Sequence, residues 1–161
     1  MRHIGFVGLG AMGLPMAENL LRKQFQVTGF DMKQEALAAL AKAGGKIAAS
    51  AQDAAKDADA LVLMVVNIAQ AESVLFDAGA LTVLPKGATV VLMATCPPKE
   101  VAQLAERVEH SGHQFIDAPV SGGVVGAQAG TLTIMAAAPS AVIAPARALL
   151  TAMGEKLFHV G

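Results

Sequence analysis

The sequence predicts an α/β fold in which a doubly wound, mainly parallel sheet carries helices on both faces. Two observations point to this class. Strand-like and helix-like segments alternate along the whole chain with short connections. The run ALVLMVV at 60–66 is apolar without alternation, as in a parallel strand buried on both faces.

The elements follow from local patterns. The helix predicted at 11–23 has apolar residues at helical spacing, and the helix predicted at 34–43 ends at Gly44-Gly45. Pro98 suits the first turn of the helix predicted at 99–111. The expected strands are 3–7, 26–30, 46–48, 60–66, 89–93, 114–118, 131–136 and 156–160. The expected helices are 11–23, 34–43, 52–56, 69–76, 99–111, 124–128 and 141–153.

Composition narrows the class of protein. The 161 residues suit one domain with a real core, and the net charge of -1 without a basic stripe disfavours nucleic acid and membrane surfaces as partners. No apolar run approaches the roughly 20 residues of a membrane span. The apolar start resembles a secretory signal, but glycines interrupt it. With a single cysteine, Cys96, we expect a cytoplasmic protein.

A glycine-rich turn follows the first predicted strand. Gly8-Leu9-Gly10-Ala11-Met12-Gly13 fits the pattern G-x-G-x-x-G, which is weak evidence alone and stronger between a strand and a helix. Gly8 permits a tight turn, Gly10 leaves room for a pyrophosphate, and Gly13 lets helix and strand pack closely. The sequence therefore predicts a Rossmann-type dinucleotide site, against the alternative of a tight turn without ligand.

The second predicted strand ends in an acidic residue. Asp31 lies 18 positions after Gly13, near the spacing expected for the residue that binds the adenosine ribose. Its carboxylate would accept hydrogen bonds from both ribose hydroxyls and repel a 2'-phosphate, which favours NAD over NADP. Lys33 weakens this preference, because a flexible cation can meet a 2'-phosphate.

Three later strands end in polar residues at the same expected edge of the sheet. These are Val65-Val66-Asn67, Thr95 and Ser121-Gly122-Gly123, the last before a predicted helix that could hold a carboxylate. Each also has an alternative interpretation as a helix cap or turn. The four histidines show no metal-ligand spacing, Cys96 lacks an adjacent base, and the methionines are interpreted as core residues.

Three segments together resemble the β-hydroxyacid dehydrogenases, the group of 3-hydroxyisobutyrate and tartronate semialdehyde enzymes. They are IGFVGLGAMGLPMAENLL, the Thr95 loop and DAPVSGGVVGAQAGTLTIMAA; LVLMVVNIAQAESVLF is similar to the L-threonate dehydrogenase branch. The resemblance covers residues 2–161. The motif MATC departs from the serines usual around this threonine, which leaves the finer cofactor contacts there open.

The resemblance implies a two-domain enzyme, with 1–161 as its NAD-binding domain and an all-helical domain, absent from this chain, that forms a dimer or tetramer. It also implies roles for single residues: Gly8 to Gly13 and Asp31 for the adenosine and pyrophosphate, Val65, Val66, Asn67 and Thr95 for the nicotinamide ribose, and Ser121, Gly122 and Gly123 for the substrate.

The family's catalytic residue has no counterpart within this chain. The family's general base is a lysine in a K-x-x-N motif, and no residue here matches it. Lys156 precedes the position where the motif should begin and is not a substitute for it. We therefore expect the catalytic lysine beyond Gly161, in the helical domain, and no catalytic residue among 1–161.

The first hypothesis is therefore the NAD-binding part of an oxidoreductase for a short 3-hydroxy acid such as L-threonate. The alternatives are a stand-alone NAD-binding module without chemistry and a related aldehyde-acid or imine reductase. The apolar ending LFHVG further predicts that another surface packs against this end of the fold.

Overall fold

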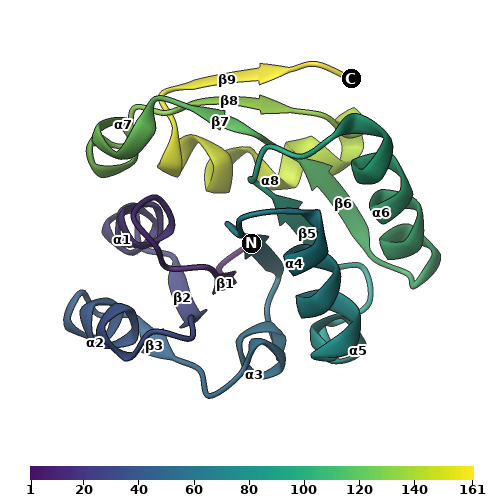
Figure 1. The fold of residues 1–161 in the computed structure, drawn as a ribbon. Coiled ribbons are helices and arrows are strands. Elements are labelled where there is room, and N and C mark those ends of the chain that lie inside the picture. Colours follow the sequence, from purple (N-terminus) through teal and green to yellow (C-terminus); the bar gives the residue numbers. More distant parts are fainter.

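A computed structural model describes residues 1–161 and places a six-stranded parallel sheet at the centre of the molecule (Figure 1). The strand order is β3-β2-β1-β4-β5-β6, so the order reverses between β1 and β4. This is the doubly wound arrangement that the sequence predicts. The strands are β1 His3–Val7, β2 Gln26–Phe30, β3 Lys46–Ile47, β4 Ala60–Leu63, β5 Thr89–Leu92 and β6 Gln114–Asp117.

Helices cover both faces of this sheet. In chain order they are α1 Gly13–Arg22, α2 Gln34–Lys42, α3 Ala51–Ala55, α4 Ile68–Glu72, α5 Ala80–Val83, α6 Pro98–His110, α7 Gly123–Ala129 and α8 Ser140–Met153. A π-helical turn, η1 Ser73–Asp77, continues α4. No helix is both long and apolar enough to cross a bilayer.

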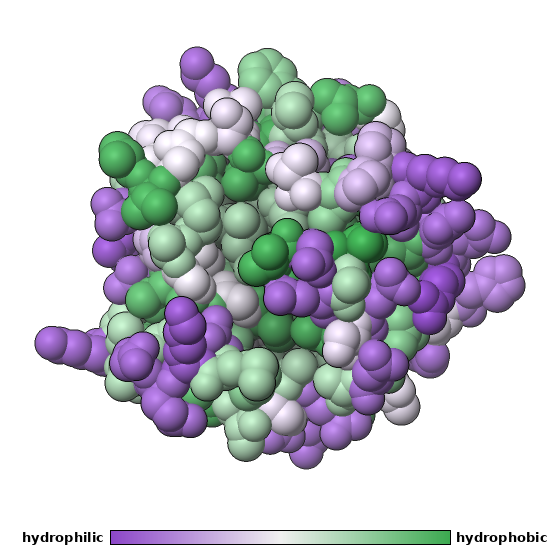
Figure 2. Space-filling model, viewed as in Figure 1, coloured by the Kyte–Doolittle hydropathy of each residue, from purple (hydrophilic) through white to green (hydrophobic).

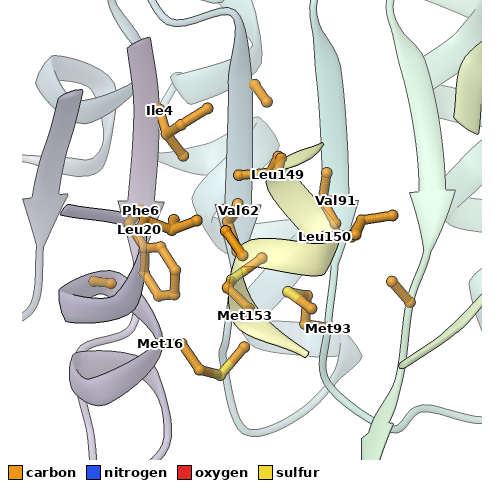
Figure 3. Close-up of a cluster of buried hydrophobic side chains, with 14 of the residues drawn as sticks. Ile4, Phe6, Met16, Leu20, Val62, Val91, Met93, Leu149, Leu150 and Met153 are labelled. Atoms are coloured by element: carbon orange, nitrogen blue, oxygen red, sulfur yellow. The ribbon is translucent and has the colours of Figure 1, made fainter. Parts of the chain in front are cut away.

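The core is divided by the sheet into two clusters. Along β4, Ala60 and Val62 face the cluster under α1, α2, α7 and α8, whereas Leu61 and Leu63 face the cluster under α3, α4, α5 and α6. Figure 3 shows the first cluster, to which β1 contributes Phe6, β4 contributes Val62 and α8 contributes Leu150. Burial on both faces explains why β4 reads as a continuous apolar run.

A second, smaller sheet lies beside the first. It consists of β7 Val120–Ser121, β8 Thr133–Ala136 and β9 Lys156–His159, with β7 antiparallel to β8 and β8 parallel to β9. One face packs inward through Ile134, which is fully buried. The other face carries Met135 and Phe158, which are register partners and are 47% and 52% exposed.

The structure corrects several predicted elements. The strand predicted at 60–66 ends at Leu63, because the chain then turns toward the cap of α4. The helix predicted at 69–76 is α4 plus η1. The four-residue α5 and the two-residue β7 were not predicted, since segments this short carry no periodicity. The strands predicted at 131–136 and 156–160 belong to the second sheet.

Hydrophilic and hydrophobic residues are mixed over the face drawn in Figure 2. Hydrophilic side chains gather on the right of that view, where Figure 1 places α4, α5 and α6. Charged residues on α6 such as Glu106 and Arg107 are exposed, while Val101 and Leu104 on the same helix are buried. This is the pattern of an amphipathic helix that covers a sheet.

Candidate functional site

The predicted site residues follow strands that run in the same direction, so they meet at one edge of the main sheet. Along that edge the order is Asp31 after β2, the glycine loop after β1, Val65 to Asn67 after β4, and Thr95 after β5. Asp117 ends β6, and Ala118 and Pro119 connect it to β7 of the second sheet, which carries Ser121. The glycine loop thus lies where the strand order reverses, which is the usual ligand position in such sheets.

Two glycines of the loop are required by the fold itself. Gly8 has φ +100°, and a Cβ built there would overlap the carbonyl oxygen of Met64. A Cβ on Gly13 would overlap the carbonyl oxygen of Gly8. Both overlaps are with backbone atoms that cannot move aside, so these positions admit only glycine whether or not a ligand binds.

Gly10 has no such internal reason to be glycine. A Cβ built there meets no heavy atom within 4 Å, its φ is not positive, and the residue is exposed. The backbone N–H groups of Gly10, Ala11 and Met12 donate no hydrogen bond within the protein. The open space and the free donors lie together at the start of α1, where the helix dipole favours an anion.

Asp31 fixes the shape of this loop. Its Oδ2 accepts a hydrogen bond from the Leu9 N–H at 2.7 Å, and its Oδ1 accepts one from the Lys33 N–H at 2.9 Å. Each carboxylate oxygen has a second lone pair and can accept one further hydrogen bond. The Leu9 side chain is buried in the core, and its N–H donates to Asp31. Leu9 therefore anchors the loop to the core.

Asn67 caps α4. Its side-chain oxygen accepts a hydrogen bond from the Gln70 N–H at 2.9 Å, and the Gln70 side-chain oxygen accepts one from the Val66 N–H at 2.9 Å. These contacts match the cap interpretation, and they hold Asn67 exposed at the sheet edge. Val66 is 79% exposed, and Val65 is half-buried.

The loop after β5 exposes Thr95 and partly covers Cys96. Burial, followed by the negative charge of Asp117, raises the pKa of the Cys96 thiol. Burial likewise raises the pKa of Asp117, which lies at the end of β6. Cys96 is therefore held in its thiol form at neutral pH, in line with the absence of an adjacent base in the sequence.

The Ser121-Gly122-Gly123 segment joins β7 to α7 and is exposed throughout. Gly122 and Gly123 have φ values of +133° and +62°, and a Cβ on Gly123 would meet no atom within 4 Å. Ser121 lies opposite Thr133 in the ladder, on the face of the second sheet that also carries Met135. This segment is accessible to a ligand or to another surface.

Lys156 lies in the same row of the second sheet as Ser121. Its register partner is Thr133, which in turn pairs with Ser121, so two strand spacings of about 5 Å each separate Lys156 from Ser121. No hydrogen bond joins the two side chains. β9 then ends at His159, and Gly161, the last residue of this chain, is exposed. The assignment of the catalytic lysine beyond Gly161 stays a prediction.

Two residues near these loops were not identified from the sequence. Asn19 of α1 is buried and donates a hydrogen bond to the Ala127 carbonyl of α7 at 2.7 Å, which ties the two loop helices together. A lone polar residue on the apolar face of a helix is the signal that could have revealed it. Met32, beside Asp31, is 89% exposed and Met135 is 47% exposed, so the interpretation of the methionines as core residues is wrong for these two.

Three of the four histidines bond to protein groups. His3 contacts the Asp57 carbonyl and the Thr28 hydroxyl, and His113 contacts the Leu84 carbonyl and the Ser111 hydroxyl. His159 contacts the Ala138 carbonyl. These hydrogen bonds give the three rings structural roles.

This geometry agrees with the families that the chain matches. Residues 3–161 match the family model described as the NAD binding domain of 6-phosphogluconate dehydrogenase. The chain belongs to this family. The predicted Rossmann-type fold and the resemblance to the 3-hydroxyisobutyrate dehydrogenase group are confirmed.

Individual relatives extend the match. The chain is 39% identical to the NAD-dependent L-serine dehydrogenase of Pseudomonas aeruginosa and 38% identical to the L-threonate dehydrogenase of Cupriavidus necator. These matches cover 100% and 99% of this chain and 54% of each relative. The 3-hydroxyisobutyrate dehydrogenase of Mycobacterium tuberculosis, solved with L-serine, superimposes with a TM-score of 0.95 at 31% identity, over 99% of this chain and 54% of that one. The chain thus spans about half the length of the relatives it matches.

Proposed function

We propose that this chain is the cofactor-binding half of an oxidoreductase that oxidises a short-chain 3-hydroxy acid by hydride transfer to NAD. The observation that carries the proposal is Gly10. The fold does not need a glycine there, yet the position is open beside three free N–H donors. A pyrophosphate fits that combination of space, donors and helix dipole.

The other parts of the cofactor are assigned to different loops along the sheet edge. Asp31 offers its free lone pairs to the adenosine ribose, and the exposed Met32 offers an apolar surface beside it. Val66, Asn67 and Thr95 line the path toward the nicotinamide ribose. Bound NAD would supply the hydride acceptor, and the residues of this chain position it and hold water away from it.

The substrate half of the site is assigned to Ser121, Gly122 and Gly123, whose exposed hydroxyl and backbone suit a carboxylate and a hydroxyl group. The proton-abstracting lysine is assigned to a helical second domain beyond Gly161, as the length of the relatives supports. That domain would also cover the exposed Met135 and Phe158 and form a homo-oligomer, in the cytoplasm. L-serine and L-threonate both carry a hydroxyl on the carbon β to the carboxylate, which makes them the first substrates to test.

Isothermal titration of the chain with NAD and NADP tests the cofactor assignment. We expect NAD to bind more tightly, because the Asp31 carboxylate repels a 2'-phosphate. In Gly10→Val the side chain occupies the open position, so NAD affinity should fall by about 100-fold, which corresponds to about 2.7 kcal/mol. Circular dichroism should show an unchanged fold, because a Cβ at Gly10 meets no atom.

Ala144→Val is the matched control, since it places a valine at an exposed site on α8, away from the loop. It should leave NAD binding unchanged. Undiminished NAD binding in folded Gly10→Val would refute the assignment of the Gly8–Gly13 loop to the pyrophosphate. NADP binding as tight as NAD binding would refute the role of Asp31. The chain alone should not oxidise L-serine or L-threonate, and turnover by it would refute the assignment of the base to a second domain.

A further inference from the structure

A cavity of about 610 Å³ opens at the amino ends of the parallel strands, at the edge opposite to the cofactor loops. Arg2 precedes β1, Asp59 precedes β4, and Thr89 and Gln114 begin β5 and β6. The loop before β5 supplies Lys86. None of these residues belongs to the site described above.

Thr89 is the unusual group in this cavity. Three polar side chains of the protein are buried, namely Asn19, Thr89 and His113. Asn19 and His113 both form hydrogen bonds within the protein, whereas the Thr89 hydroxyl forms none, although Thr89 is only 3% exposed. A hydroxyl in a largely buried residue that has no partner within the protein is satisfied by a ligand or by water.

The Thr89 hydroxyl is reached from the cavity. No side-chain oxygen or nitrogen that is completely enclosed by the protein lacks a hydrogen-bond partner, so the small exposed fraction of Thr89 includes its hydroxyl oxygen. Because Thr89 lines the cavity, the partner of this hydroxyl must come from there.

The first turn of α8 forms another part of the wall. Ala141 and Val142 line the cavity. The N–H groups of Val142 and Ile143 donate to the Pro139 carbonyl, whereas those of Ser140 and Ala141 donate no hydrogen bond within the protein. The helix has 14 residues, so its amino end carries the positive pole of a full dipole. This end of α8 therefore favours an anion in the cavity.

The side-chain charges are consistent with an anionic ligand. Arg2 and Lys86 contribute two positive charges, and Lys86 is fixed by a hydrogen bond of 2.6 Å from its Nζ to the Ser111 carbonyl. The opposing charge is Asp59, whose Oδ2 accepts hydrogen bonds from the Arg2 and His3 N–H groups at 2.8 and 3.0 Å. These two backbone donors lower the pKa of Asp59, so this carboxylate stays ionised. One negative charge thus opposes the two positive charges, and the side chains of the cavity keep a net positive charge.

We infer that this cavity binds a small phosphate-bearing anion, at a site separate from the dinucleotide. The phosphate would meet Lys86, Arg2 and the first turn of α8, and would accept a hydrogen bond from the Thr89 hydroxyl. A doubly charged tetrahedral anion matches two cations and several donors better than a carboxylate does. This site is independent of the proposed function.

Inorganic phosphate is the probe, and amide chemical shifts of the labelled chain locate its binding. We expect shifts at Arg2, Lys86 to Thr89 and Ala141. Phosphate can also reach the Gly8–Gly13 loop. Shifts there report binding at the proposed cofactor site and are counted separately. Shifts confined to Gly8–Gly13, or no shifts at millimolar phosphate, would overturn the inference. Acetate that shifts the Thr89 region as strongly as phosphate would overturn the choice of phosphate.

Three variants define the contacts. Lys86→Met should weaken phosphate binding by about tenfold, the value expected for a lost hydrogen bond to a charged group. Thr89→Val keeps the shape but removes the hydroxyl and should weaken it by about fivefold, whereas Thr89→Ser should restore it. Lys42→Met, at the exposed end of α2, is the control for net charge and should change nothing. Equal losses in Lys42→Met and Lys86→Met would show diffuse charge attraction and would also overturn the inference.

Discussion

The two glycine loops of the molecule, Gly8–Gly13 before α1 and Gly122-Gly123 before α7, share a plan: each joins a strand to the amino end of a helix. Their packing differs. Gly8 and Gly13 contact backbone atoms, and Asp31 anchors the loop through Leu9. Gly122 and Gly123 are exposed, and on α7 Val125 is 79% exposed. The first loop is held by contacts within the protein, whereas the second is exposed to solvent.

The largest expected effect is a loss of stability, greater when a glycine of the first loop is replaced by alanine than when one of the second is. Gly13→Ala puts a Cβ into the Gly8 carbonyl oxygen, so β1 and α1 must separate. We expect a loss of about 3 kcal/mol or more in the free energy of unfolding, measured in urea. Gly123→Ala, in open space with φ +62°, should cost only about 1 kcal/mol. Similar losses in both variants would contradict the difference drawn between the loops.

The next effect concerns the link between the loops. Asn19→Ala removes the donor to the Ala127 carbonyl and leaves that buried oxygen unpaired. The expected cost is about 2 kcal/mol, with faster amide exchange in α7 than in α1. Arg22→Ala is the control, because exposed Arg22 donates only to the other end of the Asn19 amide and should cost less than about 0.5 kcal/mol. Unchanged exchange in α7 would show that the loops are held independently.

Asp31 gives a smaller effect on the first loop. In Asp31→Asn one of the two acceptors becomes an NH₂ group, so either the Leu9 or the Lys33 N–H loses its partner. We expect a loss of about 1 kcal/mol in stability and a smaller preference for NAD over NADP in titration. An unchanged preference would mean that the carboxylate charge does not select the cofactor.

The smallest effect concerns Asp117, which ends the strand β6 that precedes the second loop. Burial raises the pKa of Asp117, so its charged form destabilises the fold above that pKa, and stability should rise as the pH falls through it. Asp117→Asn should therefore stabilise the protein at neutral pH by less than about 1 kcal/mol, given the solvent that still reaches the group. It should also lower the pKa of Cys96, measured by the pH dependence of alkylation. A less stable variant would reveal a structural role for the carboxylate.

The sequence predicted best what local chemistry determines. The order of β1, α1, β2 and Asp31 follows from glycine geometry and apolar spacing over about thirty residues, and the structure reproduces it. The double burial of β4 was readable because both of its faces are apolar. Its end was not, because Asn67 and Gln70 fix the start of α4 through side-chain contacts that periodicity does not encode.

Long-range pairing limited the rest. The second sheet depends on β7, a two-residue strand that pairs with β8 across α7, and no local pattern reveals such a partner. Asn19 and Met32 depend on which elements pack above them. Five separate segments of the chain likewise form the cavity of the proposed anion site. Only one of its residues stands out in the sequence, namely Thr89, a polar residue at the start of an otherwise apolar strand.

The two hydrogen bonds that Asp31 accepts have a consequence for protein engineering. The same carboxylate holds the Leu9 loop in shape and, in the proposed function, would also meet the ribose, so one side chain would set both cofactor choice and loop order. Exchange of Asp31 for a small neutral residue removes the repulsion toward a 2'-phosphate but also releases the loop. A conversion to NADP therefore needs a second change that restores an acceptor for the Leu9 N–H.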